Sequence, residues 1–261
     1  MTPDELDIQV GHLMADPLFK DMPEVYVRKF LSEDPTWPET FRALHRQHER
    51  KRAEADRRRL DALAPLFTEL DAAGVLGRSV NSPRGYLPRD KIAAAYPLLL
   101  KWYPRIDTFL AREWMASHLD TPAAADWIPN LIALFRQFRL SESANSRWKL
   151  GNAIGTYMTR DHLEDALELA ADTGFGMDRF AIVRHLWKFK TDPRILPLAT
   201  RLVIHPDHGA IKREALYVLR RIADPSSRPL FEQHVSDPDA DVRRIAREGL
   251  AKLDKQRARK T

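Results

Sequence analysis

The residues with the clearest chemical potential are two pairs of histidines, each pair separated by two residues. His45 and His48 lie in a highly charged stretch, and His205 and His208 lie in a stretch interrupted by a proline. Two imidazoles at this spacing could contribute to a metal site. Neither pair has a third ligand from cysteine, because the chain contains no cysteine. We therefore favour solvated histidines and predict no metal site.

The segment Gly174-Phe175-Gly176 begins like a loop that cradles phosphate. It lacks the third glycine of a dinucleotide fingerprint, and no predicted strand precedes it. A turn joining two helices is the simpler interpretation. The Gly-x-Ser-x-Gly, His-Glu-x-x-His and Walker motifs are also absent from the sequence. We assign no catalytic residue and no cofactor, and whether an enzymatic site is assembled from several segments stays open.

The elements that would position any site are indicated by an internal repeat. Four apolar residues between Ile211 and Ile222 recur 31 positions later, between Val242 and Leu253. Equivalent apolar positions recur upstream around Ile182 and Leu150. Spacings of three and four place these residues on one face of a helix, and a second helix such as 195–204 follows. Helical hairpins of this kind bury their apolar faces by stacking on one another.

One unit of the repeat, DPDADVRRIAREGLAKL at 237–253, resembles the HEAT-repeat signature. In that signature Asp-Pro ends one repeat, and an Asp-x-Val-Arg step opens the next helix. The resemblance implies an all-α fold, a right-handed α-α superhelix of HEAT-like repeats (an armadillo/HEAT solenoid) with an N-terminal helical extension. The chain is similar to bacterial HEAT-repeat proteins of the PBS-lyase-HEAT-like type, whose function is unassigned, so the resemblance implies a fold and no activity.

Charge and glycine content divide the chain further. Residues 1–41 carry nine acids against three bases, and residues 42–59 carry eight bases against three acids. The repeat body is nearly neutral, although the formal net charge of the chain is +5. We expect five parts: an acidic N-terminal helical segment (1–41), a long charged helix (42–73), a linker loop (74–88), the HEAT-like repeat solenoid (89–253) and a basic tail (254–261).

Basic residues recur at one equivalent position of successive first helices. In HEAT-repeat proteins this position generally pairs with the aspartate of a neighbouring turn, and Asp237 and Asp241 lie close to Arg243 in the sequence. The resemblance therefore favours a structural ladder over anion binding. The ladder consists of Arg147, Arg179, Lys212 and Arg243.

The second helices line the inner, concave surface in this architecture, and we expect a partner to bind there. Arginine and aromatic residues are favoured anchors in protein interfaces, although solvated surface residues are an equal alternative. The candidates are Trp127, Arg136, Arg139, Arg194, Arg201, Arg228 and His234.

The leading functional hypothesis is a non-enzymatic scaffold or adaptor that binds another protein. The alternative is a nucleic-acid-binding HEAT-like protein, because five tryptophans invite comparison with HEAT-like alkylpurine DNA glycosylases and because a basic helix and a basic tail are present. The tryptophans are Trp102, Trp114, Trp127, Trp148 and Trp187. The basic helix carries Arg46, Arg50, Lys51, Arg52, Arg57, Arg58 and Arg59.

The N-terminus carries acids where a secretory signal carries bases, and the longest apolar stretch, 92–100, is too short to cross a bilayer. We expect a soluble, cytoplasmic protein that does not contact a membrane. The identity of the partner, the pathway and the oligomeric state are not indicated by the sequence.

Overall fold

The computed structural model describes residues 2–79, 82–138 and 144–259. The chain divides into two compact units, Met1–Asp61 and Ala62–Thr261. The N-terminal unit contains α1 (Pro3–Ala15), α2 (Glu24–Glu33) and most of α3 (Trp37–Ala72), which continues into the second unit. Each unit has its own set of buried apolar residues.

The N-terminal unit folds around aromatic side chains. Thr2 begins α1 with a capping box, because its hydroxyl accepts from the Glu5 backbone and the Glu5 carboxylate accepts from the Thr2 backbone at 2.7 Å. Phe19 is fully buried, and its ring centroid lies 5.5 Å from that of Trp37 and 5.2 Å from that of Phe41. The acidic segment is therefore helical and has a small core that includes the start of α3.

A short hairpin occupies part of the segment for which the sequence predicts a loop. Strands β1 (Gly77–Ser79) and β2 (Ser82–Tyr86) pair antiparallel, with Gly77 opposite Tyr86. A Cβ atom at Gly77 would lie 2.7 Å from the Tyr86 ring, so only glycine permits this approach. The segment 74–88 thus contains regular structure that the glycine and proline content does not indicate.

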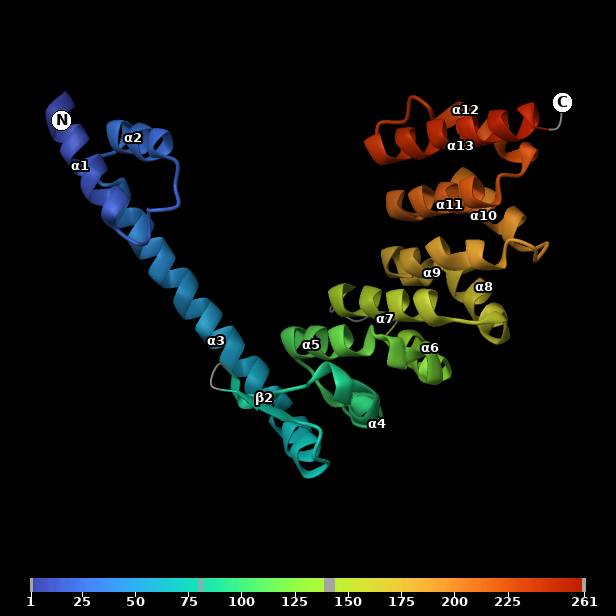
Figure 1. Ribbon diagram of the computed structural model, residues 1–261, viewed down its shortest axis with the longest axis horizontal. Helices are drawn as coiled ribbons and strands as arrows, with labels where there is room; N and C mark the ends of the chain where they lie inside the picture. Colours follow the sequence, from blue (N-terminus) through green and yellow to red (C-terminus); the bar gives the residue numbers. More distant parts are fainter. Residues whose placement is uncertain (1, 80–81, 139–143, 260–261) are drawn as a thin grey trace. The chain divides into compact units, whose positions relative to one another are not determined.

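Stacked helical hairpins form the rest of the second unit (Figure 1). After α4 (Ile92–Trp102), each hairpin has a first helix and a second helix. The first helices are α5 (Phe109–Leu119), α7 (Ala144–Tyr157), α9 (Phe180–His185), α11 (Gly209–Ile222) and α13 (Ala240–Ala258). The second helices are α6 (Ile128–Gln137), α8 (Leu163–Ala171), α10 (Ile195–Ile204) and α12 (Arg228–His234). This arrangement confirms the all-α solenoid predicted from the repeat.

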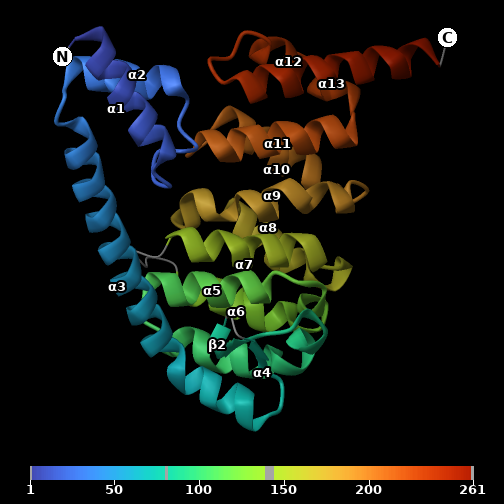
Figure 2. The ribbon, with the colours of Figure 1, turned by 60° about the vertical axis from the view of Figure 1, so that its left-hand side comes forward.

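The first helices pack side by side along the stack, as Figure 2 shows. Glycines allow α7 to approach α9 and the turn before it closely: a Cβ at Gly151 would lie 2.7 Å from the carbonyl oxygen of Asp178 in that turn, and one at Gly155 would lie 2.6 Å from that of Ala181 in α9. Most apolar positions of the predicted repeat are buried, with Ile182 and Ile211 fully inaccessible, whereas Ile222 and Leu250 are partly exposed. Burial of one apolar stripe per first helix therefore produces the stack.

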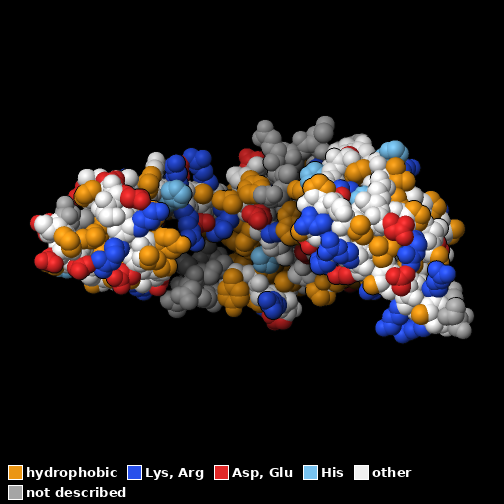
Figure 3. Space-filling view, turned by 90° about the horizontal axis from the view of Figure 1, so that it is seen from above, with side chains coloured by type: hydrophobic (Ala, Val, Ile, Leu, Met, Phe, Trp, Pro, Cys, Tyr) orange, Lys and Arg blue, Asp and Glu red, His pale blue; other side chains and the backbone are white. Residues whose placement is uncertain are grey.

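The last helix is longer than the predicted repeat. Asp239 caps its N-terminus by accepting from the backbone of Asp241 at 2.8 Å. The helix continues to Ala258, so most of the segment expected as a basic tail is helical, and Lys255 and Arg257 lie in its last turn. Lys and Arg side chains gather at this end of the molecule (Figure 3).

Candidate functional site

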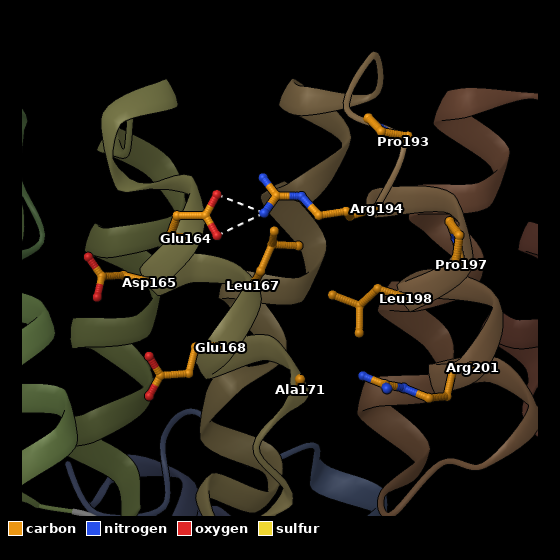
Figure 4. Close-up of a pocket in the computed structure, with 10 residues that line it drawn as sticks. All are labelled: Glu164, Asp165, Leu167, Glu168, Ala171, Pro193, Arg194, Pro197, Leu198 and Arg201. Carbon is orange, nitrogen blue, oxygen red and sulfur yellow. Dashed lines mark hydrogen bonds and ion pairs between the residues drawn. The ribbon is translucent and has the colours of Figure 1, made fainter.

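An open groove runs along the second helices α8 and α10 (Figure 4). Its cavity volume is about 780 Å³. Apolar and charged side chains of the two helices and of the turn before α10 line it. These residues are Glu164, Asp165, Leu167, Glu168, Ala171, Pro193, Arg194, Pro197, Leu198 and Arg201. The groove is the candidate functional site, because two of the predicted partner-binding residues lie in it.

Arg194 is held in place from two sides. Its Nε donates to Asp192 Oδ1 at 2.9 Å, and its Nη1 donates to Glu164 Oε2 at 2.8 Å across the groove. Side-chain and backbone hydrogen bonds from Arg194 lower the pKa of Asp192 to about 2. The guanidinium is therefore anchored by this repeat and by the preceding one before any ligand arrives.

Arg136 of α6 makes the same kind of contact one repeat earlier. It donates to Asp165 at 2.9 Å and to Glu168 at 2.7 Å, both on α8. The acids of α8 thus receive one arginine from each neighbouring repeat. Sequence reasoning missed these acids, although their separation from Arg136 and Arg194 by about one repeat length is a usable signal.

Arg201 differs from its neighbours. It is exposed, it points into the groove toward Ala171, and no hydrogen bond or ion pair is found for its side chain among the described residues. A guanidinium without an internal partner, placed over an apolar wall, can bind a carboxylate or a backbone carbonyl of a ligand. Of the predicted partner-binding arginines in the described chain, this is the one for whose guanidinium no internal contact is found.

The other predicted partner-binding residues lie outside the groove. Trp127 stacks on Tyr96 with a centroid distance of 5.9 Å. Arg228 pairs with Glu232 and with Asp254. His234 is buried, and its Nδ1 lies 2.8 Å from the carbonyl oxygen of Leu230, one turn earlier. Arg139 lies outside the described residues. The structure therefore does not gather the predicted set into one site.

The predicted ladder residues link neighbouring repeats. Arg147 donates to Asp178 Oδ2 at 2.6 Å, and Lys212 donates to Asp237 Oδ2 at 2.6 Å. Burial favours the neutral form of Asp237, but the bond from Lys212 lowers its pKa overall. In both steps, a base of one first helix reaches the turn that opens the following first helix.

The fully buried Arg179 pairs with Asp207 and donates to the backbone carbonyls of Ala170 and Gly176. Arg243 contacts carbonyl groups instead of a carboxylate, donating to Asp237 O at 2.7 Å. Asp241, which the sequence places near Arg243, pairs with Arg244 at 2.9 Å. The four ladder residues, which are equivalent in the repeat, thus occupy equivalent places in the stack but bind different partners.

The basic residues of α3 lie on an exposed helix. Arg58 pairs with Glu54, and Arg59 pairs with Asp56 at 3.1 Å, so local ion pairs satisfy part of the charge. For the remaining bases no partner is found within the described chain, and all of them are exposed: Arg46, Arg50, Lys51, Arg52 and Arg57.

One histidine of each pair and the glycine turn make local contacts. His208 caps α11 by accepting from the Ala210 backbone at 3.1 Å, and His45 lies 3.9 Å from Glu49. Asp172 accepts from the Gly174 backbone at 2.8 Å, and Gly176 has a φ of 50°, which favours glycine. No group of three potential metal ligands is found in the part of the chain that the structure describes.

Comparison with known proteins places the repeats in a family. Residues 163–251, which extend from α8 into α13, match the family described as HEAT repeats. No curated protein sequence matches the chain. Across residues 2–79, 82–138 and 144–259, none of the helices is long and apolar enough to cross a membrane. The match and the stack of helical hairpins together show that residues 163–251 consist of HEAT repeats.

Proposed function

We propose that this HEAT-repeat chain is a non-enzymatic scaffold that holds a segment of another protein in the groove of α8 and α10. The observation that carries the proposal is the composition of the groove: an apolar wall, a row of acids and one arginine with unused donors. Protein interfaces combine such an apolar centre with a polar rim. The partner segment would be extended or helical, because the groove is long and open.

The apolar contribution comes from side chains of both helices. Leu167 of α8 and Pro197 and Leu198 of α10 line the groove together with Ala171. Leu198 is nearly buried, whereas Pro197 is exposed. An apolar side chain of a partner could cover Pro197 and the edge of Leu198 and remove this surface from water.

The charged contribution is pre-organised. Because Arg136 and Arg194 already hold the acids of α8, these carboxylates lose little additional freedom when a partner binds. Glu164 and Glu168 remain exposed and can accept hydrogen bonds from a partner, while Arg201 can donate them. The groove therefore suits a segment that carries apolar residues with charges of both signs beside them.

The test is site-specific photo-crosslinking in a cell extract. A photo-reactive amino acid replaces exposed Pro197 in the groove, and a matched sample carries it at exposed Arg50 on α3. We expect one polypeptide to be crosslinked from position 197 and not from position 50. The substitution Arg201→Glu in the first sample should abolish that crosslink, since it reverses the charge at the unused donor.

Two results would contradict the proposal. One is a partner that crosslinks from position 50 with no product from position 197. The other is a crosslink from 197 that Arg201→Glu leaves unchanged although the variant keeps its melting temperature. Either outcome would remove the groove as the binding surface.

A further inference from the structure

A second charged surface lies on the first helices of the last three repeats. Bases on α9, on the turn after it, on α11 and on α13 approach one another closely, with aromatic rings between them. The bases are Arg184, Lys190, Arg213, Arg220, Arg221, Arg244 and Lys252. The acids among them are Glu214, Asp241 and Glu248. We call this set the first-helix cluster, and bases outnumber acids in it by more than two to one.

Each acid of the cluster is already engaged by arginine. Buried Glu214 receives Arg184 at 3.5 Å and Arg213 at 3.3 Å. Glu248 pairs with Arg220 and with Arg244. Arg244 also pairs with Asp241 at 2.9 Å, so these four arginines meet three carboxylates and keep a small excess of positive charge.

The remaining bases have no carboxylate partner within the described residues. Lys252 donates to the backbone carbonyls of Arg220 and Arg221 at 3.0 and 3.1 Å, at the end of α11. Burial, together with the nearby charges of Arg221, Lys190 and Arg220, lowers the pKa of Lys252. The cations are thus close enough to repel one another, and an added anion would relieve that repulsion.

The aromatic rings of the cluster are covered by guanidinium groups. Arg184 and Arg220 lie 4.9 and 4.8 Å from the centroid of the Tyr217 ring, and Arg221 lies 4.0 Å from that of Trp187. These cation–π contacts hold the arginines in position. They also occupy ring faces that a nucleic-acid base would need for stacking.

We infer that the first-helix cluster binds an acidic segment of a partner protein. Carboxylate is the anion that its arginines already bind, and the excess of bases supplies charge complementarity for further carboxylates. A phosphate chain fits less well, because the ring faces are taken and three acids lie within the surface. The inference rests on the proposed protein-binding role and assigns it a surface distinct from the groove.

The probe is a fluorescent peptide of alternating Glu and Ala, with a Gln-for-Glu peptide as the uncharged reference, measured by fluorescence anisotropy. The test variant is Lys190→Glu with Arg221→Glu, both at exposed positions. The matched control is Arg46→Glu with Arg50→Glu on α3, which changes the net charge equally. We expect the acidic peptide to bind the wild type and the control, and to bind the test variant about tenfold more weakly or worse.

The ring of Tyr217 provides a second test by substitution. Tyr217→Phe keeps the surface that positions Arg184 and Arg220 and should bind like the wild type, whereas Tyr217→Leu should weaken binding severalfold. Circular dichroism confirms that each variant is folded. If the acidic peptide fails to bind the wild type, or if control and test variants lose binding equally, the inference is wrong.

A duplex DNA probe in the same assay decides the class of partner. If duplex DNA binds more tightly than the peptide, with a steep salt dependence, and the test variant abolishes this binding, the surface recognises phosphate and the inference is overturned. The groove variant Arg201→Glu should leave peptide binding unchanged. Different variants therefore show whether the proposal for the first-helix cluster or the proposal for the groove has failed.

Discussion

The two surfaces of the repeat stack use arginine in opposite ways. On the second helices, Arg136 and Arg194 each meet acids of the adjoining repeat, so their charges are compensated where they stand. On the first-helix surface, Arg184 and Arg213 share Glu214, and neither Lys190 nor Arg221 has a carboxylate partner in the described chain. The first surface is stabilised internally, whereas the second retains unused positive charge.

Helix packing accounts for part of this difference. First helices pack directly on one another, and glycines in α7 bring the backbone of α9 especially close. Close packing concentrates side chains of successive repeats and so concentrates their charge. Second helices contact one another less, which leaves the groove between α8 and α10. The same repeat thus produces a crowded basic surface and an open, nearly balanced one.

The largest expected effect comes from the buried ladder beneath both surfaces. Arg179→Met would leave the carbonyl groups of Ala170 and Gly176, and the Asp207 carboxylate, without their donor. Arg179 is fully buried whereas Asp207 is exposed, so we expect the lower end of the about 3–5 kcal/mol that breaking a buried ion pair costs, and the urea midpoint should fall clearly.

The control for the ladder is Arg243→Met. Arg243 is only partly buried and donates to carbonyls alone, so we expect a cost of about 1 kcal/mol. Equal midpoints for the two variants would show that the Arg179 pair contributes nothing beyond its hydrogen bonds to the backbone. Both groove and cluster binding should weaken in the Arg179 variant at temperatures where it begins to unfold.

The next effect concerns the close packing of the first helices. In Gly155→Ala the new Cβ would meet the Ala181 carbonyl oxygen at 2.6 Å, so α9 must shift. Overpacking of this kind costs about 1–3 kcal/mol. Thermal unfolding should detect it as a lower melting temperature. Gly209→Ala is the matched control, because no atom lies within 4 Å of its added Cβ, and it should be neutral or slightly stabilising.

The sequence predicts the fold well because each repeat depends on local periodicity. The second helix at 195–204 and the buried positions around Ile182 and Ile211 follow from spacings of three and four alone. The hairpin at Gly77–Tyr86 does not follow, because its pairing depends on the close approach of Gly77 to an aromatic ring.

The sites were harder to predict because their partners come from other repeats. The acids that hold Arg136 and Arg194 lie about thirty residues away, so neither arginine shows from its neighbours that it is already paired. Asp241 illustrates the reverse error: it is close to Arg243 in sequence, but Arg244 lies one helical turn away from it and takes the contact. Spacing within one helix is local information, whereas the groove and the cluster are products of stacking.

His185, on α9, makes the stability of the protein depend on pH. His185 lies beside Lys188 and Arg184, and its Nδ1 is buried without a partner in the described chain. Burial, reinforced by these two charges, lowers its pKa to about 4. Since the unfolded chain binds this proton near pH 6.5, stability should fall as the pH is lowered from about 6.5 to about 4 and change little above that range.

A fully buried imidazole with this shift would lose about 3 kcal/mol, and solvent screening of the partly exposed ring reduces the expected loss to about 1–2 kcal/mol. Urea unfolding at about pH 7 and about pH 5 measures it. His185→Gln cannot take up the proton and should lose less stability over the same interval. An identical pH dependence in this variant would assign the acid sensitivity to other groups.

The smallest effects, which test the comparison most directly, have opposite signs on the two surfaces. Lys190→Ala removes an exposed cation from a crowded basic cluster, so the urea midpoint at low salt should stay constant or rise slightly. Arg194→Ala removes the bonds to Asp192 and Glu164 and should lower the midpoint slightly. Salt screens both interactions, so the urea midpoints of the two variants should approach that of the wild type as the ionic strength increases. If both variants lower the midpoint equally at low salt, the positive charge of the first-helix surface is compensated in the free protein, and the contrast between the two surfaces disappears.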